Sequence, residues 1–181
     1  SYCSSRILKA ITAPSIRTYR KCFITYVRPI LEYASIIWSP HQQFLIDRLE
    51  KVQKRFTKIA LLKIDFQKHS SLNYAQRFDL FNLQSLHHRR LVIDILECFK
   101  ILKCKQSDPI FQNFYSFEQR SVSRRGPFRL TRSKFLSNTR SRSFKLRTEK
   151  LWNALPLTLR QTNSFSAFSN GIKDLDLTTL L

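Results

Sequence analysis

Glycine is nearly absent from this chain, and its scarcity constrains the fold more than any other feature. Only Gly126 and Gly171 occur among 181 residues. Tight β-hairpin turns depend on residues that tolerate a positive φ, above all glycine, so few such turns are expected. We therefore predict a mainly α-helical fold: a helical bundle of about five to seven helices, with a basic loop or short β-hairpin near residues 113–140.

The spacing of apolar residues predicts where the helices lie. Residues 15–27 have helical periodicity, and Pro29 then either kinks that helix or begins a second one. Further helices are expected over residues 72–81, 86–103 and 143–155, and a last one is capped by Ser164 and closed by Gly171. Between them lies a long amphipathic helix whose apolar stripe comprises Leu45, Leu49, Val52, Phe56 and Ile59.

The charge of the chain favours a polyanionic partner. The formal net charge is +20, from 32 Lys and Arg against 12 Asp and Glu. Between Gln119 and Thr148 there is no acidic residue, whereas ten are Lys or Arg. This stretch is either a flexible basic loop or a clamp that orders on nucleic acid. Its Phe128, Phe135 and Phe144 either stack on bases or anchor the loop to the core.

Catalytic and metal chemistry are not expected from these residues. The chain has no Asp-Asp pair for a two-metal centre, no glycine-rich phosphate loop and no G-x-S-x-G motif. Its four cysteines are too scattered for a zinc site, and Cys22 and Cys98 are expected to be free thiols in the core. No metal or cofactor site is predicted, no apolar run is long enough to span a membrane, and no signal peptide is expected.

We predict that basic side chains bind nucleic acid through phosphate contacts, although a merely solvated surface is the alternative for the helical ones. The predicted contacts are Lys51, Lys54, Arg55, Lys58, Arg89, Arg90, Arg124, Arg125, Arg129, Arg132, Arg140 and Arg142. The predicted structural core includes Tyr26, Pro29, Tyr33, Trp38, Phe56 and Trp152.

Four blocks of sequence, in order, resemble the region that follows the polymerase core in non-LTR (LINE-type) retrotransposon reverse transcriptases. The first block comprises Tyr26, Arg28, Pro29, Leu31, Glu32, Tyr33, Trp38 and Pro40, and the second comprises Glu50, Val52, Gln53, Arg55 and Phe56. The third comprises Leu83, Leu86, Arg89 and Arg90, and the fourth comprises Gly126, Arg140, Trp152, Asn153, Leu155 and Pro156.

The resemblance implies a non-catalytic C-terminal fragment of an RNA-directed DNA polymerase that holds template–primer nucleic acid. Its segments would be thumb-like helices (1–43), a basic amphipathic bundle (44–106), a basic loop or clamp (107–142) and C-terminal helices packing back on the bundle (143–181). A polymerase core upstream of Ser1 would be its partner and would hold the Mg²⁺ for which this chain has no predicted site. Together with the charge, it implies an intracellular ribonucleoprotein, nuclear or cytoplasmic. The alternatives are a stand-alone RNA-binding module and a decayed element copy without function.

Overall fold

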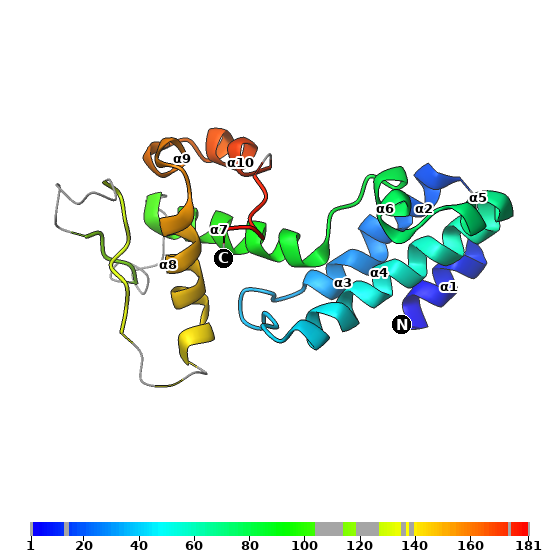
Figure 1. The fold of residues 1–181 in the computed structure, drawn as a ribbon, viewed down its shortest axis with the longest axis horizontal. Helices are drawn as coiled ribbons and strands as arrows, with labels where there is room; N and C mark the ends of the chain where they lie inside the picture. Colours follow the sequence, from blue (N-terminus) through cyan, green and yellow to red (C-terminus); the bar gives the residue numbers. More distant parts are fainter. Residues whose placement is uncertain are drawn as a thin grey trace. The chain divides into compact units, whose positions relative to one another are not determined.

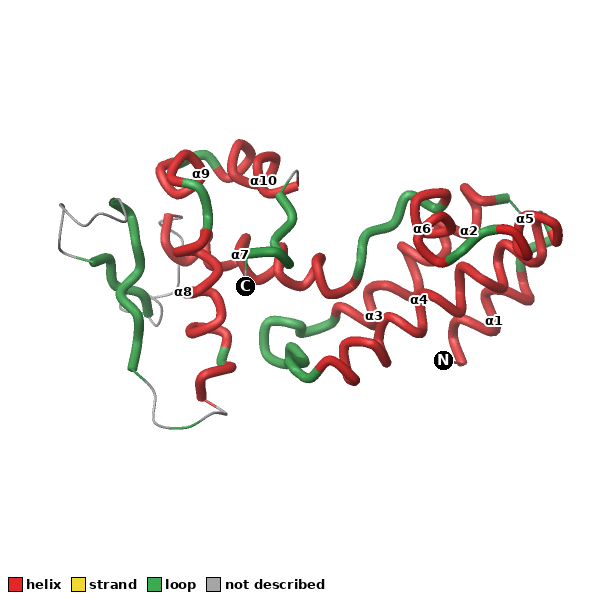
Figure 2. The backbone as a smooth tube through the Cα atoms, in the orientation of Figure 1, coloured by secondary structure: helices red, strands yellow, loops and turns green. Residues whose placement is uncertain are grey.

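The computed structural model describes residues 2–12, 15–103, 114–118, 127–134, 137, 140–173 and 175–180. Over these residues the protein is mainly helical, as predicted (Figure 1). Loops and turns join the helices in the backbone trace of Figure 2. The chain divides into two compact units, which we describe separately. The N-terminal unit comprises Ser1–Ala34 and Pro40–His87, and the C-terminal unit comprises Ser35–Ser39 and His88–Leu181.

The helices of the N-terminal unit begin with polar caps at two positions. The Ser15 hydroxyl accepts a hydrogen bond from the Thr18 amide at 3.1 Å, and Asn73 and Gln76 form a reciprocal capping box. The α-helices are α1 (Tyr2–Ala10), α2 (Ile16–Cys22), α3 (Arg28–Glu32), α4 (Gln43–Ile64), α5 (Phe66–Ser71) and α6 (Tyr74–Leu80).

A π-helical turn over Phe23–Val27 lies between α2 and α3. The Arg28 amide donates to the Phe23 carbonyl, five residues back rather than four. This wider turn directly precedes Pro29, which has no amide hydrogen to continue an α-helical ladder. After this turn α3 begins at Arg28 with Pro29 in its first turn, which is the second of the two predicted alternatives.

Phe56 of α4 joins the first helices to the rest of the N-terminal unit. Its ring packs edge-on against Tyr19, with ring centroids 6.3 Å apart, and lies 5.0 Å from Phe23. All three side chains are fully buried. The predicted segments 1–43 and 44–106 therefore differ from the observed units, because residues on both sides of position 43 share this core.

Of the core residues predicted from sequence, Phe56 and Trp152 are confirmed, and four are wrong. Tyr26 is 59% exposed, Tyr33 is 78% exposed and Trp38 is 42% exposed, and Pro29 is exposed as well. Tyr19, Phe23 and Val27, four residues apart, form the buried side of this helical stretch, so Tyr26 lies off it. Tyr33 and Trp38 follow α3 in non-helical segments.

The buried side of α4 is rotated from the predicted stripe by about one residue. Leu45, Leu49, Val52 and Ile59 are only half-buried, whereas Glu50, Gln53 and Thr57 are buried beside Phe56. Hydrogen bonds offset part of the cost of this burial, because a buried polar group is costly only when it is unpaired. Gln53 Nε2 donates to the Gln84 carbonyl at 3.2 Å, and Glu50 Oε1 accepts from the His87 amide at 3.2 Å.

In its described part, the C-terminal unit contains one helix before the acid-free stretch of the sequence and three helices near or after its end. Its helices are α7 (Leu86–Lys103, which begins in the N-terminal unit), α8 (Phe144–Ala154), α9 (Leu157–Gln161) and α10 (Phe165–Lys173), with a 3₁₀ turn at Arg140–Arg142. Within the described part of residues 113–140, one antiparallel bridge pairs Phe117 with Leu130. This bridge is the observed counterpart of the predicted loop or hairpin.

Aromatic stacking joins α7, α8 and α10. The Phe99 and Phe168 rings stack with centroids 4.3 Å apart, and Trp152 lies 5.8 Å from Phe168. The predicted closing role of Gly171 is wrong, because Gly171 lies inside α10, which continues to Lys173. A Cβ at Gly171 would lie 2.5 Å from Leu159 Cδ2, so the missing side chain allows α10 to approach α9 closely.

Candidate nucleic-acid interface

One side of α4 carries a concentrated positive charge, which we call the α4 basic face and define as Lys51, Lys54, Arg55 and Lys58. All four side chains are exposed. They lie within eight consecutive residues at helical spacing, so they occupy about two turns, or roughly 10 Å of helix axis. The predicted exposure of these four residues is confirmed.

The acidic residues of α4 are fewer than the cations of its basic face. The helix, described over its whole length, contains two carboxylates, Asp47 and Glu50. Glu50 is buried and bonded to the His87 amide, and Asp47 accepts from Gln43 Nε2 at 3.1 Å. Because the four cations of the α4 basic face outnumber these two carboxylates, the face keeps a net positive charge.

Lys54 lies on an aromatic ring whose hydroxyl stays protonated at neutral pH. Its Nζ lies 4.7 Å from the centroid of the Tyr74 ring, a cation–π distance. Burial, reinforced by the negative charge of Glu50, raises the pKa of the Tyr74 hydroxyl. Tyr74 thus supports the lysine as a neutral phenol and adds no negative charge to the face.

Residues 127–134, which we call the basic segment, are fixed to α8 by side chains of that helix. Trp152 Nε1 donates to the Phe128 carbonyl at 2.9 Å. Asn153 pairs with both backbone groups of Leu130 at 2.9 Å each. One turn earlier, Glu149 accepts from the Ser133 amide at 3.0 Å and from its hydroxyl at 2.8 Å.

Two basic side chains of the basic segment are exposed, and a third forms a hydrogen bond within the protein. Arg132 and Lys134 are exposed. Arg129 is half-buried, and its Nη1 donates to the Asn153 carbonyl at 3.2 Å, so part of its guanidinium holds the segment in place. Phe128 lies under Lys103, whose Nζ is 5.2 Å from the ring centroid.

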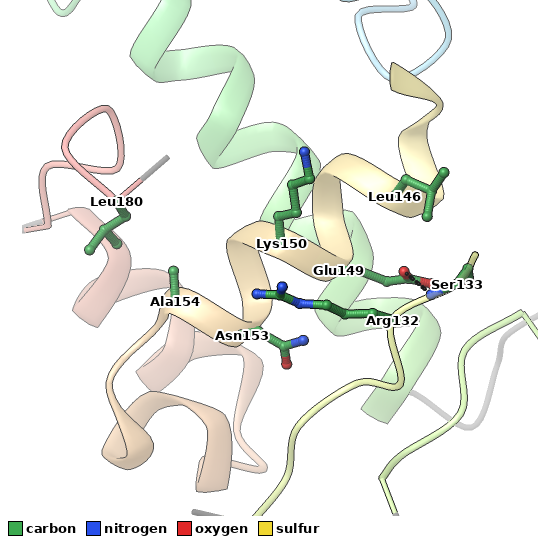
Figure 3. A pocket seen from close by; sticks show the side chains of 8 residues that line it. All are labelled: Arg132, Ser133, Leu146, Glu149, Lys150, Asn153, Ala154 and Leu180. Carbon is green, nitrogen blue, oxygen red and sulfur yellow. Dashed lines mark hydrogen bonds between the residues drawn. The ribbon is translucent and has the colours of Figure 1, made fainter. Parts of the chain in front are cut away.

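A cavity of about 410 Å³ opens beside the basic segment and α8 (Figure 3). Its polar lining combines two exposed cations, Arg132 and Lys150, with the hydrogen-bonded Ser133, Glu149 and Asn153. The remaining lining side chains are apolar: Leu146, Ala154 and Leu180.

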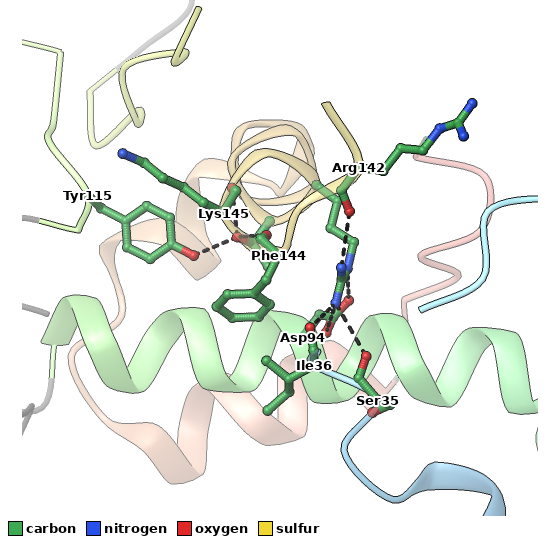
Figure 4. A network of polar contacts seen from close by, with 9 residues as sticks. Ser35, Ile36, Asp94, Tyr115, Arg142, Phe144 and Lys145 are labelled. Atoms are coloured by element: carbon green, nitrogen blue, oxygen red, sulfur yellow. Dashed lines mark hydrogen bonds and ion pairs between the residues drawn. The ribbon is translucent and has the colours of Figure 1, made fainter. Parts of the chain in front are cut away.

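Arg147 of α8 takes part in a network of polar contacts with Asp94 and with backbone carbonyls. Figure 4 labels Asp94, Ile36 and Arg142 of this network. Arg147 Nε and Nη2 contact the two carboxylate oxygens of the buried Asp94 at 2.6 and 3.1 Å. The same guanidinium donates to the carbonyls of Ile36 at 2.7 Å and Arg142 at 3.3 Å. Burial raises the pKa of Asp94, and the hydrogen bonds and charge of Arg147 oppose that effect.

Arg140 and Arg142 are exposed on the 3₁₀ turn before α8, as expected for nucleic-acid contacts. Arg90, in contrast, is a wrong prediction. Its side chain is only 1% exposed, and its guanidinium lies 4.9 Å from the Trp38 ring centroid, four residues before the acidic Asp94. Arg89, in the first turn of α7, is half-buried.

Arg124 and Arg125, and also Phe135, lie outside the described residues. Among the exposed cations that the sequence reasoning missed, three lie on or beside the surfaces described above: Arg48, Lys134 and Lys150. Arg48 could have been found from its position three residues before Lys51 on the same helix. Lys134 could have been found because it lies in the stretch without acidic residues. Lys150 has no such signal in the sequence, and only the cavity that it lines identifies it.

Two features are absent from the described residues. Across these ranges, no three His, Cys, Asp or Glu side chains gather in a way that could hold a metal ion. No helix in the described part of the chain is long and apolar enough to cross a membrane.

Comparison with known proteins places this chain in no family. No protein-family model, no curated protein and no solved structure matches it.

Proposed function

We propose that this chain is a non-catalytic C-terminal part of a LINE-type retrotransposon reverse transcriptase and that it holds template–primer nucleic acid electrostatically. The observation that carries the proposal is the α4 basic face, where four exposed cations lie within two turns of a helix that contains only two carboxylates. Such a face contacts phosphates without reading bases.

The basic segment supports the same function in the C-terminal unit. Arg132 and Lys134 extend from a backbone that α8 fixes through Glu149, Trp152 and Asn153. A backbone that is already fixed loses less conformational freedom on binding than a mobile one does. Trp152 and Asn153 also belong to the fourth block of the family resemblance, so the resemblance falls on residues that position cations.

In this proposal the chain performs no chemistry. Any Mg²⁺ would be bound by the polymerase core, the proposed partner, and the protein would act in an intracellular ribonucleoprotein. Because phosphate contacts carry the affinity, binding should depend steeply on salt and only slightly on sequence.

The test is a titration of the full chain with a short RNA–DNA hybrid at several salt concentrations. Replacing Lys51, Lys54, Arg55 and Lys58 with Ser should reduce the slope of log affinity against log salt by about 0.9 for each phosphate that the variant no longer neutralises. A matched control replaces Lys9, Arg17, Lys21 and Lys173, which are exposed on other helices, and so removes the same charge. A flat slope for the unmodified chain, or equal reductions in both variants, would contradict the proposal.

A further inference from the structure

The cavity beside α8 combines two features that a nucleotide requires. Its volume of about 410 Å³ falls within the range of small-molecule sites. Leu146, Ala154 and Leu180 provide apolar surface, and Arg132 and Lys150 provide positive charge. Figure 3 shows Arg132 reaching from the basic segment across α8, the helix from which Lys150 projects.

The polar groups of the lining differ in whether they are already engaged. Both oxygens of Glu149 accept hydrogen bonds from Ser133, and both polar atoms of the Asn153 amide pair with the Leu130 backbone. Within the part of the chain that the structure describes, neither Arg132 nor Lys150 has a hydrogen bond or an ion pair. The acidic and amide groups are thus hydrogen-bonded within the fold, and the two cations, which outnumber the one carboxylate of the lining, remain available to an anion.

We propose that this cavity binds one unpaired nucleotide, with its phosphate held by Arg132 and Lys150 and its base against Ala154 and Leu180. This inference rests on the proposed function and assigns a specific role to one part of it. Charge-assisted hydrogen bonds from Arg and Lys are the usual means of holding phosphate. The apolar surface then accounts for the base, since an isolated phosphate would leave that surface uncovered.

The site should accept all four bases about equally. Asn153 is the lining side chain best suited to pair with a base edge, and its hydrogen-bonding groups are already used by Leu130. Contact with apolar surface does not distinguish bases by hydrogen-bonding pattern. The cavity would therefore hold a strand end or an unpaired position rather than a particular sequence.

The experiment compares binding of a blunt RNA–DNA hybrid with binding of the same hybrid carrying a single-nucleotide overhang. The unmodified chain should prefer the overhang by about tenfold, the effect expected of one charge-assisted contact. Replacing both Arg132 and Lys150 with Ser should abolish the preference. The matched control is Arg140→Ser with Arg142→Ser, which removes the same charge from the C-terminal unit outside the cavity and should keep the preference.

A second variant tests the cavity without changing charge. Ala154→Phe places a ring in the apolar part of the lining, so it should remove the overhang preference while leaving the salt dependence of blunt-hybrid binding unchanged. Thermal unfolding of each variant verifies that it is folded, and Ala154→Val provides a smaller filling if the phenylalanine disrupts α8. Equal binding of blunt and overhanging hybrids by the unmodified chain, or a preference that survives both fillings, would overturn the proposal.

Titration with free nucleoside 5′-monophosphates and with inorganic phosphate distinguishes the sources of the ligand. Saturable binding of the mononucleotides that Arg132→Ser weakens would assign the cavity to free nucleotides and overturn its assignment to a strand. Overhang preference without such binding would support the strand. Failure of the proposed function can be distinguished from failure of this inference. It would appear as a flat slope of log affinity against log salt for the blunt hybrid.

Discussion

The amide side chain of Asn153 forms a closed pair with the backbone of Leu130. Nδ2 donates to the Leu130 carbonyl and Oδ1 accepts from the Leu130 amide, both at 2.9 Å. The arrangement resembles one rung of an antiparallel ladder, with a side chain in place of the second strand. Leu130 itself is fully buried, so neither of its backbone groups has water as a substitute partner.

Asn153→Ala should therefore destabilise the C-terminal unit by about 1–3 kcal/mol, the cost of leaving buried polar groups unpaired. Denaturant unfolding measures the change. Asn170→Ala removes the same amide from an exposed position and should change stability by less than about 0.5 kcal/mol. Comparable effects of the two substitutions would show that the pair with Leu130 contributes little.

Arg147→Met should destabilise the protein by about 3–5 kcal/mol, because the buried Asp94 would lose the guanidinium that contacts both its oxygens and would keep only the more remote charge of Arg90. The double variant with Asp94→Leu should recover much of that stability by removing the stranded charge. Hydrogen exchange at residues 35–37 should also become faster in both variants, since Arg147 no longer holds the Ile36 carbonyl. A double variant no more stable than Arg147→Met would contradict this account.

Cys98 should resist alkylation in the folded protein. Its side chain is fully buried, and burial raises the pKa of its thiol to about 12, so almost no thiolate exists at pH values near neutrality. Cys22 is half-buried and should react faster with iodoacetamide. Peptide mapping by mass spectrometry measures the alkylation rates of Cys98 and Cys22. In urea, which unfolds the chain, the two rates should become similar. Rapid native labelling of Cys98 would contradict the burial.

Stability should fall as the pH is lowered from about 8 to about 5, through the ordinary pKa of histidine. Burial lowers the pKa of His88 below its ordinary 6.5, although Asp176 at 4.0 Å opposes the effect. The unfolded chain then binds a proton more readily than the folded one, and stability is lost as the pH falls through the unfolded pKa. Thermal unfolding across this range should show a smaller decline for His88→Gln than for the unmodified chain. An unchanged decline would assign the effect to other groups.

The helices are largely predictable from sequence because their apolar periodicity and caps are local. The helix predicted over residues 86–103 is observed as Leu86–Lys103, and Ser164 precedes α10 as expected. Burial is less predictable where tertiary partners decide it. Nothing in the sequence near Glu50 and Gln53 indicates that the His87 amide and the Gln84 carbonyl would let them enter the core.

The candidate site is predictable in composition but not in its detail. The cluster around Lys51 follows from helical spacing, and its exposure follows from the same pattern. The prediction for Arg90 is wrong because a basic residue early in a helix looks solvent-facing until Trp38, distant in sequence, is seen to lie near its guanidinium. The cavity requires the fold, since Arg132 and Lys150 approach a common space only after the basic segment docks on α8.

The π-helical turn at Phe23–Val27 makes the angular position of the helix after it depend on chain length. It accommodates one residue more than an α-helical turn would. A chain shortened by one residue there would regain a regular ladder and rotate the following side chains by about 100° around the axis. Ile30, now 61% exposed, would then move to a different side of the helix. Length at this turn, and not only composition, selects which apolar groups meet solvent.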